Sequence, residues 1–193
     1  MNTTKVRRDE ILDLGAYEGI REHFRARVIA EKRARYVSIG EHMTALFENH
    51  DSVLFQIQEM LRTERITKER AILHELETYN ELVPAEDELS ATIFVEYPDR
   101  DERERMLRAL AGLENRFYLV AGGERARLIP DHRGTDPSIA MAVHYVKFVL
   151  GEVGASVVRS GKGPVLLGVD HPSYEAETAL SAETLLSLSR DFE

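Results

Sequence analysis

One stretch of the chain changes its hydrophobic period within a few residues. Residues 43–48 follow a period of two, which is typical of a strand whose two faces are both partly covered. Asn49, Asp51 and Ser52 come next, and such side chains accept hydrogen bonds from the free N–H groups at a helix start. Apolar side chains then recur at helical spacing as far as Leu61. The stretch therefore predicts a strand that leads directly into an amphipathic helix.

This central helix also carries apolar side chains outside its main stripe. Val53 and Ile57 belong to the stripe, whereas Leu54 and Phe55 lie beside it. A helix that is apolar over more than one face usually packs against two partners. We expect the second partner to be the C-terminal half of the chain or a second copy, and a homodimer is predicted.

The rest of the N-terminal half predicts two further helices and a small hairpin. Residues 17–35 place apolar side chains at steps of four, with arginines on the flanks. Residues 36–39 form a short strand that turns at Gly40 into the strand described above. A third helix follows an N-cap at Thr67 and ends at Pro84.

The C-terminal half is rich in strand patterns joined mostly by short turns. The pair Gly122-Gly123 between residues 117–121 and 124–129 is typical of a two-residue hairpin turn. Asp99 and Ser181 are each predicted to cap a helix. The remaining strands are expected at residues 91–97, 139–150, 165–170 and 174–180. An antiparallel sheet covered by helices follows from this order.

The predicted fold class is therefore α+β. A helical N-terminal half with a small hairpin is expected to pack on a mostly antiparallel sheet in the C-terminal half. We predict a single domain over residues 1–193, helix-rich in 1–83 and sheet-rich in 90–193.

Composition restricts the classes of function. The chain has no cysteine, so it holds neither an iron–sulfur cluster nor a thiol nucleophile, and a cytoplasmic location is expected. We find neither an export signal nor an apolar run long enough to cross a membrane. The net charge of -9 argues against nucleic-acid binding. Residues 1–35 nevertheless hold nine Lys and Arg against six acids, which predicts a solvated helix face or, alternatively, a docking surface for an acidic partner.

Sequence motifs for common cofactors are missing. The chain has no Gly-x-Gly-x-x-Gly for a dinucleotide, no phosphate loop, no HExxH and no Gly-x-Ser-x-Gly. It also lacks the Glu-x-x-His pair of di-iron helix bundles. These absences leave a divalent metal as the cofactor class still open.

Histidines and carboxylates remain as candidate site residues. His42, Glu48 and His50 are close in sequence, but a strand places them on different faces, so one metal takes at most two of them. Asp170 and His171 come at the end of an apolar strand, where they either organise a turn or serve a functional site. His144 shares a strand face with apolar residues, which is typical of a core histidine. His42, His144 and His171 are the metal-ligand candidates.

Five sequence blocks carry a family resemblance, namely HMTALFENHDSVLFQIQEMLRTERI, LHELETYNELVP, ATIFVEYPD, the GG hairpin and GVDHPSYEAE. In order and spacing they resemble the uncharacterised bacterial domain-of-unknown-function family 3501. The resemblance implies a genomic context beside rubrerythrin-like and iron–sulfur oxidoreductase-like proteins. The candidate functional residues inside the matching blocks are His42, Glu48, Gln58, Glu59, Arg62, Asp170, His171 and Tyr174.

Two functions are compatible with these observations. The first is an accessory or binding protein, expected as a homodimer, that docks on a redox partner. The second is a small metal-dependent or acid-base enzyme that uses His42, Glu48, Glu59 and Arg62 with Asp170 and His171. An enzyme should bring these groups into one pocket, whereas an accessory protein leaves them dispersed.

Overall fold

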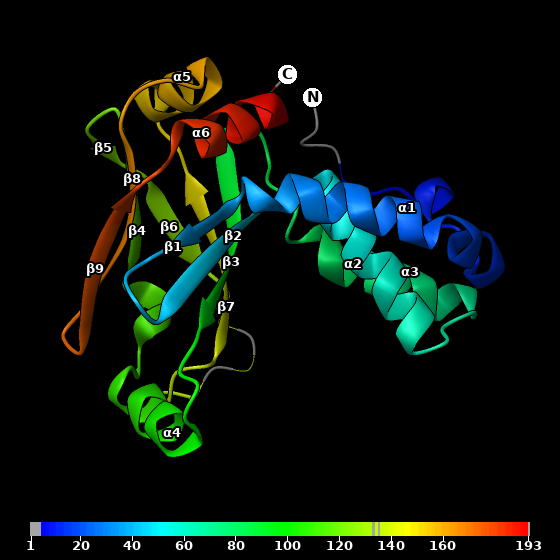
Figure 1. The fold of residues 1–193 in the computed structure, drawn as a ribbon, viewed down its shortest axis with the longest axis horizontal. Helices are drawn as coiled ribbons and strands as arrows, with labels where there is room; N and C mark the ends of the chain where they lie inside the picture. Colours follow the sequence, from blue (N-terminus) through cyan, green and yellow to red (C-terminus); the bar gives the residue numbers. More distant parts are fainter. Residues whose placement is uncertain (1–4, 133, 135, 193) are drawn as a thin grey trace.

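Two antiparallel sheets face each other and three helices project from their side (Figure 1). The structure is a computed structural model that describes residues 5–132, 134 and 136–192. The first sheet has the strand order β1(Tyr36–Ser38), β2(Met43–Glu48), β3(Glu88–Val95), β7(Val143–Val149) and β6(Arg127–Pro130). The second has the order β5(Glu124–Arg125), β4(Phe117–Ala121), β8(Val165–His171) and β9(Tyr174–Ala179). All neighbouring strands are antiparallel, so the α+β prediction is confirmed.

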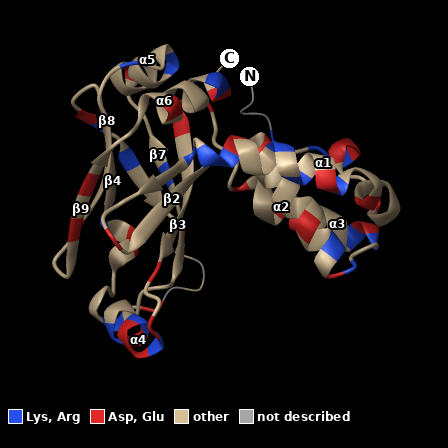
Figure 2. Ribbon diagram, in the orientation of Figure 1, with Lys and Arg blue, Asp and Glu red and all other residues tan. Residues whose placement is uncertain are grey.

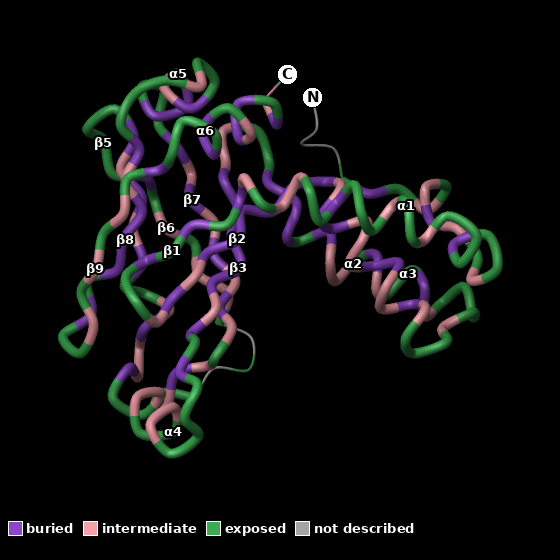
Figure 3. Tube along the Cα trace, in the orientation of Figure 1, coloured by how far each residue is buried: buried purple, intermediate pink, exposed green. Residues whose placement is uncertain are grey.

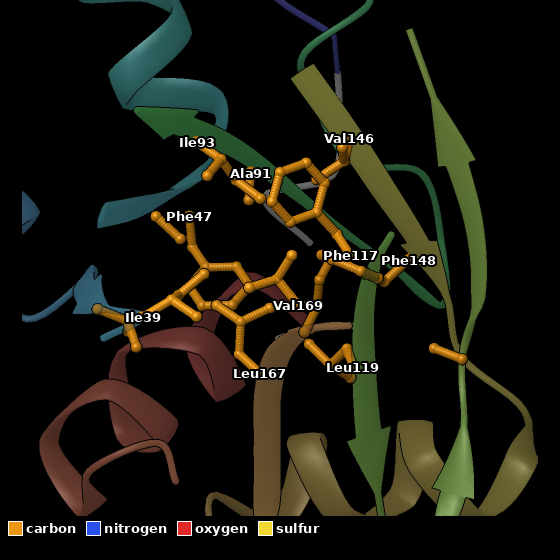
Figure 4. Close-up of a cluster of buried hydrophobic side chains, with 14 of the residues drawn as sticks. Ile39, Phe47, Ala91, Ile93, Phe117, Leu119, Val146, Phe148, Leu167 and Val169 are labelled. Carbon is orange, nitrogen blue, oxygen red and sulfur yellow. The ribbon is translucent and has the colours of Figure 1, made fainter. Parts of the chain in front are cut away.

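The main hydrophobic core lies between the two sheets. Because side chains alternate along a strand, every second residue points into this space. Figure 4 shows Phe47 and Phe148 of the first sheet facing Phe117, Leu119 and Leu167 of the second. This core therefore requires two layers of strands, where the sequence predicted one sheet.

The turn at Gly122-Gly123 is confirmed, but the strand that follows it is interrupted. Both glycines have positive φ angles, 62° and 84°, as a two-residue hairpin turn requires. The predicted strand over residues 124–129 splits at Ala126, whose N–H donates to the carbonyl of Leu119. The chain leaves the second sheet at this residue and enters the first.

The three projecting helices form what we call the arm: α1(Leu14–Arg33), α2(His50–Thr63) and α3(Glu69–Asn80), preceded by the short helix η1(Arg8–Glu10). They have their own apolar cluster, in which Val53, Ile57 and Leu61 of α2 pack against Ile72 and Leu76 of α3. The helix α2 contacts α1 as well as α3. Two helices of the same chain thus cover the two apolar sides of α2, where we had expected the C-terminal half or a second copy.

The remaining helices close the two ends of the sandwich (Figure 1). The helix α4(Arg100–Ala109), followed by η2(Leu113–Asn115), lies at one end, and α5(Glu152–Ser160), α6(Ala182–Ser189) and η3(Arg190–Phe192) lie at the other. The side chains of Asp99 and Ser181 accept from the N–H groups of Glu102 and Thr184, so both predicted caps are confirmed. Within the described part of the chain, no helix is long and apolar enough to cross a membrane.

Candidate functional site on the arm and at its junction with the sheet

His42 and Tyr174 meet where β9 approaches the β1–β2 hairpin. The His42 ring stacks on Tyr97 with centroids 4.2 Å apart. The Tyr174 hydroxyl donates to the carbonyl of Ile39 at 2.7 Å and accepts from the His42 backbone N–H at 3.1 Å. These contacts join the two sheets along one edge, so they have a structural role.

His171 uses both of its ring nitrogens inside the protein. The backbone N–H of Ser173 donates to Nδ1 at 3.1 Å, so Nε2 carries the proton and donates to the carbonyl of Ala111 at 3.2 Å. The neighbouring Asp170 is exposed and forms an ion pair with Arg125 at 3.0 Å. A metal ion would have to displace one of these hydrogen bonds to reach His171.

Glu48 lies buried at the root of the arm. Its two carboxylate oxygens accept from the hydroxyls of Thr92 at 2.6 Å and Ser52 at 2.5 Å. The same Ser52 also donates from its backbone to the Asn49 side chain, which caps α2. Glu48 thus anchors the start of α2 to the first sheet, and hydrogen bonds already use both oxygens.

A buried ion pair next to Glu48 was not predicted from the sequence. Arg35 is 1% exposed, donates to the carbonyls of Phe47 and Glu48, and holds both carboxylate oxygens of Asp191 at 3.2 and 2.5 Å. The sequence placed Arg35 on a solvated helix face, because no local signal points to a partner 156 residues away. This contact ties the root of the arm to the last turn of the chain.

Gln58 and Glu59 hold the N-terminal part of the arm to α2. The Gln58 amide accepts from the backbone N–H of Leu12 at 2.6 Å and donates to its carbonyl at 3.3 Å. Glu59 accepts from the Tyr17 hydroxyl at 2.7 Å and from two nitrogens of Arg21 at 2.8 Å. Burial and the adjacent Glu59 carboxylate raise the pKa of Tyr17, and Arg21 lowers the pKa of Glu59.

Arg62 follows on the same side of α2. It forms an ion pair with Glu18 of α1 at 2.7 Å, and about one third of its side chain is exposed. Together with Glu59 it joins α2 to α1 through polar contacts.

His144 lies inside the sandwich, as its strand pattern predicted. Its ring contacts Phe117 edge-on with centroids 5.5 Å apart, and burial lowers its pKa. Its Nε2 atom has no hydrogen-bond partner among the described residues. Burial therefore disfavours the charged form of this imidazole, and the described residues place no carboxylate and second histidine with it as a group that could hold a metal.

The candidate residues are thus distributed over separate parts of the molecule. His42, Tyr174 and His171 lie on the sandwich, Glu48 at the root of the arm, and Glu59 with Arg62 on the arm itself. Across residues 5–132, 134 and 136–192, no group of three or more His, Asp or Glu is arranged to hold a metal ion. Tyr174 lies beside His42 and opposite His171 on the β8–β9 pair, and Glu59 lies near Arg62 on α2. The structure does not gather the candidates of the sandwich and those of the arm into one site.

The helix α1 exposes most of its surface. Of its 20 residues only Tyr17 and Val28 are buried, and Figure 3 shows the helix largely in the colours of exposed and intermediate residues. We define the α1 outer face by its exposed residues Gly19, Ile20, Glu22, His23, Arg25, Ala26, Ile29, Ala30 and Arg33. Ile20 and Ile29 are 47% and 36% exposed, and Figure 2 shows charges of both signs along the arm.

A concave site lies where the arm meets the first sheet. This junction hollow has a volume of about 350 Å³ and is lined by Lys5, residues 80–82, Ser90, residues 129–131 and residues 145–147. A smaller hollow of about 230 Å³ adjoins it and shares Leu82, Asp131 and Tyr145. One feature of the sequence pointed to this site. Tyr145 and Lys147 share the face of β7 that lies opposite its core face.

Comparison with known proteins identifies relatives over nearly the whole chain. The family model described as protein of unknown function (DUF3501) matches residues 5–192. The crystal structure of a novel protein of unknown function from Burkholderia pseudomallei K96243 is similar with a TM-score of 0.90 and 35% sequence identity, covering 98% of this chain and 100% of that chain. No curated protein sequence matches the chain.

Proposed function

Because the chain belongs to the DUF3501 family, whose description carries no activity, we propose from its geometry that it is a non-catalytic accessory protein. It binds an acidic partner protein through the α1 outer face. The observation that supports this proposal is a 20-residue helix that buries only two residues. Helices in proteins are stabilised mainly by packing an apolar face, so an exposed helix of this length is available for a partner.

Besides the buried Tyr17 and Val28 and the contact of Phe24 with Phe55 of α2, the contacts that hold α1 are polar and partly exposed. Ion pairs join Arg21 to Glu59, Arg62 to Glu18 and Arg27 to Asp51. Such pairs contribute about 0–1 kcal/mol each, so they position α1 but stabilise it little. Additional burial against a partner would complete the packing of this helix.

The charge of α1 indicates the chemistry of the partner. Although the whole chain has a net charge of -9, α1 carries five Lys and Arg against three Glu. Arg25 and Arg33 of the outer face form no ion pair with any residue that the structure describes. The family resemblance implies a redox context, so a redox protein with an acidic face is the partner class we propose.

The predicted homodimer would have to use another surface. A two-fold dimer presents the same patch from both copies, so two α1 outer faces would bring four cations, Arg25 and Arg33 from each copy, into one interface. The alternative of a metal-dependent or acid-base enzyme would require His42, Glu59 and Asp170 to share a pocket, and they lie apart. These points favour a different protein as the occupant of α1.

A photo-crosslinking amino acid placed at Ala26 or Ile29, which lie on the same side of α1 as Arg25 and Arg33, tests the docking surface in the source cells. We expect both positions to capture one acidic protein, and a crosslinker at the exposed Leu186 of α6 serves as the control. Binding of the purified captured protein should weaken at least tenfold, about 1.4 kcal/mol, in the double variant Arg25→Glu, Arg33→Glu.

The charge control reverses two exposed cations elsewhere, Arg105→Glu with Lys162→Glu. Equal weakening in this control would show a general effect of net charge and would contradict the proposed surface. Crosslinks from Ala26 and Ile29 to a second copy of the chain would contradict the accessory function and indicate a homodimer formed through α1.

A further inference from the structure

We propose that the junction hollow binds a small organic carboxylate with an apolar body. The hollow is lined by α3 and the first sheet, and no residue of α1 contributes to it. Its volume of about 350 Å³ lies in the range of small-molecule sites. The proposal is therefore independent of the docking surface on α1.

Lys147 supplies the first donor for the carboxylate. Its ammonium group contacts Glu88 at 3.2 Å and the carbonyl of Val83 at 3.4 Å, and its side chain is 27% exposed. An ammonium group has three N–H donors, so one remains for a ligand in the hollow. Lys5, which is exposed and also lines the hollow, adds a second cation.

Ser90 supplies a second donor beside Lys147. The residue is only 2% exposed, yet its hydroxyl makes no hydrogen bond with any described residue. Ser90 and Lys147 are directly opposite each other on β3 and β7, so both side chains lie on the same face of the sheet. Ser90 lines the hollow, so its hydroxyl is placed to donate to a carboxylate oxygen of the ligand.

The other side chains that line the hollow indicate the chemistry of the rest of the ligand. Leu82, Ile129, Pro130 and the Tyr145 ring supply apolar surface. Two carboxylates, Glu81 and Asp131, also line the hollow, and each already interacts with another group. The ligand carboxylate should therefore lie at the Lys147 and Ser90 end, with its apolar body against Tyr145 and Ile129.

Benzoate and benzamide are the probes for this site, because they have the same shape and differ in charge. Binding to the full chain is measured by ligand-observed NMR and by titration calorimetry. We expect benzoate to bind at millimolar concentrations or below and benzamide to bind at least about tenfold more weakly. Lys147→Met should weaken benzoate by about tenfold and abolish the preference over benzamide, which corresponds to about 1.4 kcal/mol.

Two further variants keep the test informative if Lys147→Met folds poorly. Ile129→Trp fills the hollow and leaves its charges in place, so it should abolish benzoate binding while the circular dichroism spectrum is unchanged. Lys162→Met removes an exposed lysine between α5 and β8 and should leave benzoate binding unchanged. The proposal is overturned if the wild-type chain fails to bind benzoate, or if benzoate binds equally well to Ile129→Trp.

Discussion

Removing the buried Arg35 guanidinium should destabilise the protein more than any other single charge removal at the root of the arm. In Arg35→Met the carboxylate of Asp191 loses its cation, and the carbonyls of Phe47 and Glu48 lose their donor. Breaking a buried ion pair by removing one partner costs about 3–5 kcal/mol. A typical domain has only about 5–15 kcal/mol of stability, so this loss is a large fraction.

The relative losses of stability in several variants test these contacts more sharply than the loss in a single variant. Asp191→Asn should cost less than Arg35→Met, because Arg35 keeps both backbone carbonyls as acceptors. Adding Asp191→Leu to Arg35→Met should recover part of the loss, since a buried carboxylate without a cation is then removed. Arg190→Met, at the exposed neighbour of Asp191, is the matched control and should be neutral.

Urea unfolding followed by circular dichroism measures these free energies. For a chain of this size, about 3–5 kcal/mol corresponds to a fall of about 6–20 °C in the melting temperature. A loss below about 1 kcal/mol for Arg35→Met would refute the reasoning, because that is the range of ordinary surface ion pairs.

Two other predictions follow from local contacts. The hydrogen bond from the His50 ring to the Asp51 carboxylate, together with the nearby Glu10, raises the pKa of His50 above its ordinary 6.5. The stabilisation from His50 should be fully present below pH 6.5 and be lost as the pH rises through the raised pKa. Urea unfolding at a series of pH values should show this dependence of the free energy of unfolding. The variant His50→Gln should remove it. Gly122→Ala should destabilise more than Gly123→Ala in the same assay, because an added Cβ at Gly122 would lie 2.8 Å from an α5 side chain, whereas at Gly123 nothing lies within 4 Å. Equal losses in the two glycine variants, or the same pH profile in His50→Gln, would contradict these arguments.

Local chemistry in the sequence was enough to predict most of the elements. The strand that leads into α2 was expected because the alternation of its side chains and the capping residues Asn49 and Ser52 are local signals, each contained in a few residues. The turn at Gly122-Gly123 was predicted because few other residues tolerate two consecutive positive φ angles. The hairpin of β1 and β2 was predicted for the same local reason.

The candidate site was harder to predict from the sequence. The residues selected within the matching blocks include Glu48, Gln58 and His171, and each is occupied by hydrogen bonds inside the protein. Polarity and position in a motif could not show this, since the partners come from other elements. The junction hollow escaped prediction because Ser90 and Lys147 become neighbours only when β3 pairs with β7.

By itself, the sequence determined the helices and most of the strands, the α+β class and the absence of cysteine chemistry, because these depend on composition and near neighbours. The tertiary structure alone decided that the strands divide at Ala126 into two sheets and that Arg35 pairs with Asp191. It also decided that α1 remains exposed. Such features depend on which distant segments pack together, and that choice is set by the free energy of the whole core and not by any local pattern.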